Sequence, residues 1–188
     1  MDGWPVHSSL ALTALSSAAF WARRHTEEVL RHWGPPAEMV ESAVLVVSEL
    51  VANAVKATAD GLDEREQRLY DHRPAALPYV RLAALGVVRL TLCSDYRRVL
   101  VEVWDHGPGI PVLGDPADDA LSGRGLMLVD SLCGRWGWYP VGNGAPGPTQ
   151  PQPQPQPQPQ DQPQDQLRRR GKVVWGLLCH SGPDGTRA

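Results

Sequence analysis

The sequence predicts an α+β fold: a two-layer sandwich with helices on one face of a mixed, mostly antiparallel sheet. Three patterns predict it. Apolar residues recur at helical spacing through residues 17–57, β-rich runs occupy residues 87–104, and a last apolar strand falls at residues 172–179. With 188 residues, of which 42% are hydrophobic, the chain can bury one core of ordinary size. We therefore expect residues 1–188 to form a single domain.

Two helices come first in the predicted order. Residues 17–32 place apolar side chains near one helix face, and Gly34, Pro35 and Pro36 end this helix. Proline at the first helical position suits the start of a second helix at residues 36–57, where apolar residues recur every three or four positions. Both helices should cover the sheet with their apolar faces.

Strands and one short helix follow. Residues 87–94 and 98–104 are β-rich runs with a three-residue gap between them, which predicts a hairpin. Beyond it we expect a short helix at residues 125–132 and a strand at residues 136–139 that pairs with the strand at residues 172–179. The predicted order is therefore α-α-β-β-α-β-β.

Two segments do not fit this core. Residues 60–78 are charged and contain two prolines, which predicts a loop. Residues 150–160 strictly alternate glutamine and proline, and because proline removes backbone donors and fixes φ, this stretch can enter neither a helix nor the interior of a sheet. We expect a disordered Pro/Gln-rich insertion at about residues 141–168. It is either a linker expanded by a repeat, which we favour, or a ligand for a proline-recognising module.

Charge and cysteine content exclude several classes of protein. The 18 basic and 21 acidic residues leave a net charge of −3, which argues against broad electrostatic binding to nucleic acid or to an anionic membrane. Cys93, Cys133 and Cys179 form no C-x-x-C pair, so we expect buried free thiols in a cytoplasmic protein rather than a disulfide framework or a zinc site. The apolar residues 10–22 lack the preceding basic segment of a signal peptide, and no uncharged apolar run reaches the ~18 residues of a membrane span.

Three polar motifs carry the candidate chemistry. In the first, Glu49 and Asn53 lie four residues apart in the second helix and therefore share one helix face. An asparagine oxygen is a hard, neutral ligand that suits Mg²⁺, and a carboxylate one turn away can deprotonate an attacking hydroxyl. Taken alone, the pair is better explained as an ordinary polar stripe.

The second motif is an aspartate at the end of a strand, Asp105, followed by a turn with Gly107 and Gly109. A buried carboxylate could accept a hydrogen bond from the exocyclic amine of adenine, and the glycines would let the backbone pass close under the base. Taken alone, a strand that ends in a Gly/Pro turn explains this motif equally well.

The third motif opens the short helix with Gly123, Arg124, Gly125 and Leu126. Free N–H groups at a helix N-terminus, with glycines that permit close approach, form an anion site suited to polyphosphate. A flexible turn with an N-cap is the other interpretation. The order and spacing of all three motifs together favour a nucleotide site.

This conjunction of motifs resembles the ATP-binding (Bergerat) fold of the GHKL superfamily, to which gyrase and the histidine kinases belong. The phrases VVSELVANAV, GRGLMLVDSL and GRWGW…KVVWGLL are similar, more closely, to bacterial anti-sigma-factor serine/threonine kinases of the actinobacterial type. The resemblance covers about residues 18–139 and the last strand.

The resemblance implies a role for each matching residue. Glu49 would be the catalytic base that acts on a serine or threonine hydroxyl, and Asn53 would hold the Mg²⁺ that bridges the phosphates of ATP. Asp105 would bind adenine. The remaining nucleotide-binding residues that it implies are Gly107 and Gly109 at the adenine pocket, Gly123, Arg124 and Gly125 against the phosphates, and Leu126 beside them.

The implied function is that of an ATP-dependent protein serine/threonine kinase that phosphorylates an antagonist protein and sequesters a sigma factor. It would act in the cytoplasm, without direct contact to nucleic acid or membrane, and a homodimer is compatible with the resemblance. The alternative is a non-catalytic module in which bound ATP only shapes a partner-binding surface. A histidine-kinase fragment is disfavoured because only about 35 residues precede the second helix.

Overall fold

The computed structural model describes residues 4–58, 86–107, 110–113, 124–141 and 171–179. The helices and strands in these residues are, in chain order, β1 (Val6–Thr13), α1 (Ala18–Trp33), α2 (Ala37–Thr58), β2 (Val87–Ser94), β3 (Arg98–Asp105), α5 (Arg124–Leu132), β4 (Arg135–Pro140) and β5 (Lys172–Cys179). The predicted loop at residues 60–78 and nearly all of the predicted insertion at residues 141–168 lie outside the described residues.

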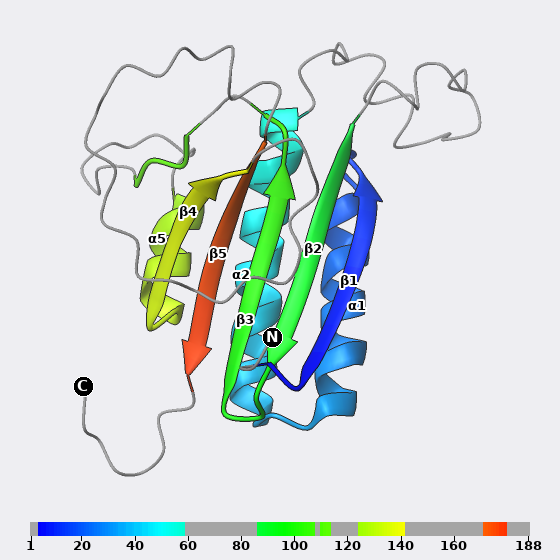
Figure 1. The fold of residues 1–188 in the computed structure, drawn as a ribbon, viewed down its shortest axis with the longest axis vertical. Helices are drawn as coiled ribbons and strands as arrows, with labels where there is room; N and C mark the ends of the chain where they lie inside the picture. Colours follow the sequence, from blue (N-terminus) through cyan, green and yellow to red (C-terminus); the bar gives the residue numbers. More distant parts are fainter. Residues whose placement is uncertain (1–3, 59–85, 108–109, 114–123, 142–170, 180–188) are drawn as a thin grey trace.

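The five described strands form one sheet in the order β1-β2-β3-β5-β4, and every neighbouring pair among them is antiparallel. The helices α1, α2 and α5 lie on one face of this sheet, and α2 runs behind its centre (Figure 1). None of the helices in the described part of the chain is long and apolar enough to cross a membrane. The arrangement confirms the predicted α+β sandwich with helices on a single face.

The strand β1 is missing from the predicted order, which is therefore wrong at its N-terminal end. β1 pairs with β2 along its whole length, and its side chains alternate between partly buried and exposed. Leu10 and Leu12 pack against the core, as expected for a half-buried edge strand. The strand is hard to recognise in the sequence because its aliphatic end continues into the apolar start of α1, so residues 10–22 look like one apolar segment.

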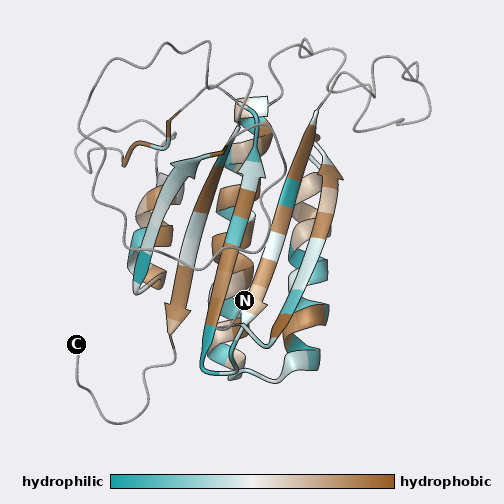
Figure 2. Cartoon of the chain, viewed as in Figure 1, coloured by the Kyte–Doolittle hydropathy of each residue, from teal (hydrophilic) through white to brown (hydrophobic). Residues whose placement is uncertain are grey.

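The core lies between α2 and the facing side of the sheet. α2 contributes one row of buried side chains, and alternate residues of β2, β3 and β5 point at them. Figure 2 shows the hydrophobic residues along α2 and these strands. The central members are Ala43, Val46, Val47, Leu50, Val51 and Ala54 from α2, and Leu90, Leu92, Val101, Val103, Val174 and Leu178 from the sheet. Full burial of one Val or Leu side chain contributes about 1.5–3 kcal/mol, so this layer holds α2 against the sheet.

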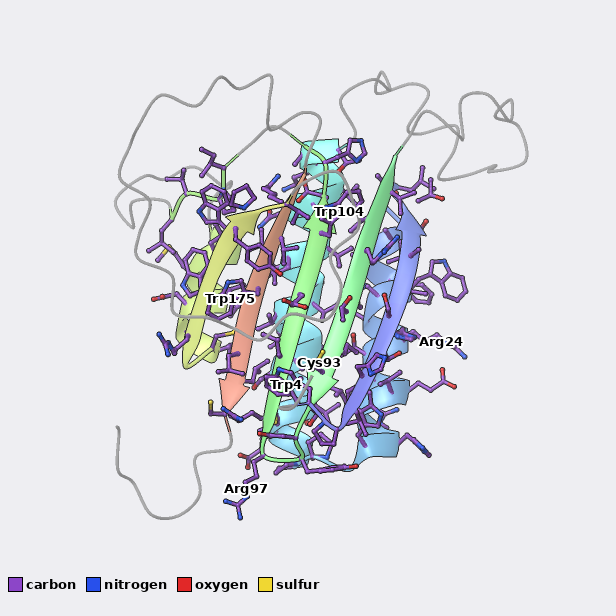
Figure 3. The ribbon with its side chains drawn as sticks, viewed as in Figure 1. Trp4, Arg24, Cys93, Arg97, Trp104 and Trp175 are labelled. Carbon is purple, nitrogen blue, oxygen red and sulfur yellow. The ribbon has the colours of Figure 1, made fainter. Side chains whose placement is uncertain are left out.

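The face of the sheet away from the helices carries a second, smaller cluster. Cys93, Leu100 and Leu177 are buried there, and Trp4 and Trp175 pack against them. Figure 3 shows Trp4, Cys93 and Trp175 on this side of the sheet. These tryptophans therefore contribute to packing on the face opposite α2.

The three cysteines are free, and two of them are buried as predicted. Burial raises the pKa of Cys93 and of Cys133 to about 12, so both stay thiols at neutral pH. Cys179 is exposed, contrary to the prediction, at the last position of β5.

Local sequence signals set two of the element ends. Gly34 follows α1 in the left-handed conformation, with φ 78°, and its N–H donates to the carbonyl of Leu30. The β2–β3 hairpin turns at Asp95, whose carboxylate accepts the N–H groups of Arg97 and Arg98. Both features confirm the predicted helix stop and the predicted hairpin.

The strands β4 and β5 form the second predicted pair. Pro140 lies opposite Lys172, and the N–H of Val141 donates to the carbonyl of Gly171 at 3.0 Å. The chain therefore leaves and re-enters the sheet at adjacent positions. On the other side of β5, Lys172 lies opposite Asp105, the last residue of β3. The candidate site forms at this end of the sheet.

Candidate nucleotide-binding site

A cavity of about 220 Å³ lies at this end of the sheet, between α2, the start of α5 and the ends of β3 and β5. Its lining residues are Leu50, Asn53, Ala54, Ala57, Asp105, Ile110, Pro111, Val112, Gly125, Leu126, Lys172 and Val174. Each of the three sequence motifs contributes to this lining, through Asn53, Asp105 and Gly125. Three segments far apart in the chain therefore meet at one cavity.

The face of α2 that borders the cavity carries Glu49 and Asn53. The two residues are one helical turn apart, as their spacing predicts, and both are half-buried. Asn53 lines the cavity, whereas Glu49 lies beside it, against Gly125 of α5. In the described part of the chain, no hydrogen bond or ion pair engages the Glu49 carboxylate.

Gly125 lets α5 begin this close to α2. A Cβ at this position would collide with a carboxylate oxygen of Glu49 and would come within 3.5 Å of Asn53 Nδ2. The first N–H groups of a helix have no partner inside the helix, so the start of α5 offers donors to an anion at this point. The glycine therefore lets the Glu49 carboxylate lie directly against the start of α5.

Asp105 ends β3 at the cavity and is only 1% exposed. Its Oδ1 accepts two hydrogen bonds, from Lys172 Nζ at 2.6 Å and from the N–H of Gly107 at 2.8 Å. The Lys172 ammonium also donates to the carbonyl of Gly107, at 3.0 Å. Burial raises the pKa of the Asp105 carboxyl, and the hydrogen bonds from Lys172 and Gly107 oppose that shift.

Gly107 allows the turn after β3 to pack against the C-terminal end of α2. A Cβ there would collide with the backbone carbonyl of Ala57. Gly107 does not itself line the cavity, whereas Ala57 and Asp105 on either side of this contact do. The glycine therefore shapes the cavity wall by permitting close backbone approach.

Three members of the predicted set are not fully placed. Gly109 and Gly123 lie outside the described residues, and of Arg124 the structure describes only the backbone, which begins α5. Their roles stay predictions. Leu126, the next predicted member, is buried and lines the cavity from α5.

Lys172 is absent from the predicted set, although it lines the cavity and is only 5% exposed. One signal could have indicated it: Lys172 begins an otherwise apolar strand, and a buried lysine is rare unless it is paired. The partner could not be identified from local spacing, because Asp105 lies 67 residues away in the chain.

Comparison with known protein families agrees with this geometry. Residues 12–144 match the family model of the histidine kinase-like ATPase domain. The match spans more than half of the 188 residues, and the chain belongs to this family. Domains of this family, which are ATPases of the GHKL type, bind ATP, typically together with Mg²⁺. A search of curated proteins found no match.

Proposed function

We propose that this chain is an ATP-binding regulatory protein of the anti-sigma-factor type, which phosphorylates a serine or threonine of an antagonist protein and sequesters a sigma factor. The observation that carries the proposal is the convergence of Asn53, Asp105 and Gly125 on one cavity, with the Glu49 carboxylate beside it. These groups match the needs of phosphoryl transfer, which are a nucleotide site, a metal ligand and a base.

The lining of the cavity supports adenine as its occupant. Among the described residues, both donors to Asp105 reach Oδ1, which leaves Oδ2 available to an exocyclic amine. Leu50, Ala54 and Val174 supply apolar walls for the faces of the ring. A carboxylate between apolar walls is a typical way to bind and orient a small polar heterocycle.

Asn53 is the residue that would hold Mg²⁺. This ion usually keeps several waters and binds through one or two protein groups together with substrate phosphates. The described residues contain no group of three or more His, Cys, Asp or Glu side chains that could hold a metal ion by themselves. The single amide of Asn53 at the cavity wall fits a Mg²⁺ that is held mainly by phosphates and waters. When bound, Mg²⁺ neutralises charge on the phosphates.

Glu49 would act on the protein substrate. Its carboxylate is half-buried beside the start of α5 and has no partner among the described residues, so it can accept the proton of an incoming hydroxyl. The hydroxyl oxygen then forms the new bond to the γ-phosphorus, and ADP leaves. Alignment of the hydroxyl with the phosphate, together with neutralisation of the phosphate charge, supplies most of the rate enhancement in reactions of this kind.

Transfer of label from γ-labelled ATP to a purified antagonist protein tests the proposal. Wild type is expected to label a serine or threonine, and Glu49→Ala to transfer about 100-fold more slowly while it still binds Mg-ATP. Glu49→Gln keeps the size of the side chain but removes the base, so it should behave like Glu49→Ala. Undiminished transfer by both variants would exclude Glu49 as the base.

The same experiment separates the kinase from a non-catalytic module. Tight ATP binding by wild type, with no transfer to an antagonist that it binds, would favour the module. Binding of a purified sigma factor, measured with and without ATP, tests the sequestering role. Light scattering on these samples reports whether the chain forms the homodimer that the resemblance allows.

A further inference from the structure

The charged pair Lys172–Asp105 lies in an enclosed part of the cavity. Asp105 is 1% exposed and Lys172 is 5% exposed, whereas Ile110 and Val112 in the same lining are 52% and 72% exposed. Ile110 and Val112 therefore border the cavity on a solvent-exposed side, whereas the pair is shielded from solvent. A ligand that enters the cavity meets Lys172 and Asp105 with its innermost atoms.

Each member of the pair keeps one hydrogen-bonding position for such a ligand. Both partners of Asp105 in the described part of the chain reach Oδ1, so Oδ2 remains an acceptor. The Lys172 ammonium has three N–H donors, of which one is directed to Oδ1 at 2.6 Å and one to the carbonyl of Gly107 at 3.0 Å. Among the described residues, one donor of Lys172 and the Oδ2 acceptor of Asp105 therefore remain for a ligand.

Adenine has an edge complementary to this arrangement. Its N6 amine donates a hydrogen bond, and the adjacent ring atom N1 accepts one. Both atoms lie on the side of the base opposite N9, which carries the ribose and, through it, the phosphates. With the phosphates near Gly125 at the start of α5, the N1–N6 edge is the part of ATP that reaches the enclosed end of the cavity.

We propose that Lys172 recognises adenine by donating a hydrogen bond to its N1 atom, while Asp105 accepts a hydrogen bond from the N6 amine. This assignment rests on the proposed ATP-binding function and deepens it. It adds a specificity-determining residue from β5, which lies beyond the matched residues 12–144. A merely structural lysine would neutralise Asp105 without any contact to the base.

Nucleotide analogues with one ring atom replaced test the assignment on the wild-type chain. In 1-deaza-ATP a C–H group replaces N1, and we expect it to bind about 10-fold to 100-fold more weakly than ATP, the range for a hydrogen bond to a charged group. 7-Deaza-ATP is altered on the other edge of the base and should bind like ATP. Equal affinity for 1-deaza-ATP and ATP would overturn the assignment, and so would a loss confined to 7-deaza-ATP.

Two substitutions separate base reading from a structural role. Lys172→Met should bind ATP more weakly and should no longer discriminate between ATP and 1-deaza-ATP, because the donor is gone. A structural lysine predicts the opposite: both nucleotides weaken equally and their affinity ratio stays as in wild type. Lys172→Gln retains an N–H donor and should keep part of the discrimination. If both variants fail to fold, the wild-type analogue series still decides.

The outcomes also distinguish this assignment from the function on which it rests. Absence of ATP binding by wild type would overturn the proposed function and the assignment with it. ATP binding combined with full affinity for 1-deaza-ATP would overturn the assignment alone.

Discussion

Adding a methyl group at position 125 tests whether phosphoryl transfer requires the close contact between α5 and Glu49 of α2. In Gly125→Ala, the new Cβ would collide with a carboxylate oxygen of Glu49. Because this oxygen ends a flexible side chain that can rotate away, and because alanine is favoured over glycine in a helix by about 1 kcal/mol, the free energy of unfolding should change by no more than about 1 kcal/mol. The displaced carboxylate should instead slow phosphoryl transfer by about 100-fold.

Gly134→Ala is the matched control for this substitution. The nearest atom to a Cβ at position 134 is Cys179 Sγ at 3.7 Å, an ordinary contact, so stability and transfer should both stay close to wild type. Urea unfolding measures the first property and the labelled-ATP assay the second. Full transfer by Gly125→Ala would contradict the placement of the Glu49 carboxylate at the reaction centre.

The free energy of unfolding should depend on pH through the buried carboxyl of Glu102. This residue is 6% exposed, and its carboxyl accepts a hydrogen bond from the Tyr139 hydroxyl at 3.1 Å. Burial raises the pKa of Glu102 from its ordinary 4.5 to about 7, although the bond from Tyr139 opposes the shift. The folded chain therefore binds this proton more tightly than the unfolded chain. The contribution of protonated Glu102 to stability is therefore complete below about pH 4.5 and is lost as the pH rises to about 7.

Urea unfolding of wild type and Glu102→Gln across this pH range isolates the effect. The free energy of unfolding of wild type should fall relative to that of Glu102→Gln, by on the order of 3 kcal/mol. The glutamine variant does not titrate at this position and serves as the reference. Parallel profiles for the two proteins would show that the folded chain does not hold Glu102 in its neutral form.

At the scale of helices and strands, sequence patterns predict the helix ends and turns that form through contacts between residues close in the sequence. The end of α1 at Gly34 and the turn at Asp95 involve contacts within four residues, and both were predictable. β1 was not predictable, because only short polar residues interrupt the apolar segment at residues 10–22, which therefore resembles the start of one helix. The contact of Lys172 with Asp105 depends on the register of β5 against β3, which distant parts of the chain determine. Local motifs thus indicated Asn53, Asp105 and Gly125, which line the cavity, but not Lys172, the long-range partner of Asp105.

From the pairing of β4 with β5, we expect the Pro/Gln-rich stretch to be dispensable for folding. Val141 and Gly171 are joined by a backbone hydrogen bond of 3.0 Å, so a short turn can close the hairpin in place of residues 142–170. A shorter loop costs less closure entropy, and we expect the free energy of unfolding to rise by about 1 kcal/mol. Urea unfolding and Mg-ATP binding measure the outcome. Loss of ATP binding in a folded variant would show that residues 142–170 contribute to the site, against their interpretation as a linker.

At the scale of the whole molecule, the candidate site exists only in the folded chain. Asn53 belongs to α2, Asp105 to β3 and Gly125 to α5, and the core between α2 and the sheet is what brings the first two together. A ligand that needs all three cannot bind the unfolded chain with the same affinity. Binding must therefore stabilise the fold, by an amount that depends on ligand concentration.

This coupling makes Mg-ATP a measurable stabiliser. At a free concentration 100 times its Kd, Mg-ATP should raise the free energy of unfolding by about 2.7 kcal/mol, and for a chain of this size Tm should rise by roughly 5–11 °C. ATP in the presence of a chelator should give a smaller rise, because the Mg²⁺ that Asn53 would hold is removed. Asn53→Ala should lose the Mg²⁺-dependent part, whereas Lys56→Ala, an exposed position on the same helix outside the cavity lining, should keep it. An equal rise in Mg²⁺ and in chelator would exclude Asn53 as the metal ligand, and no rise at all would mean that the cavity does not bind ATP.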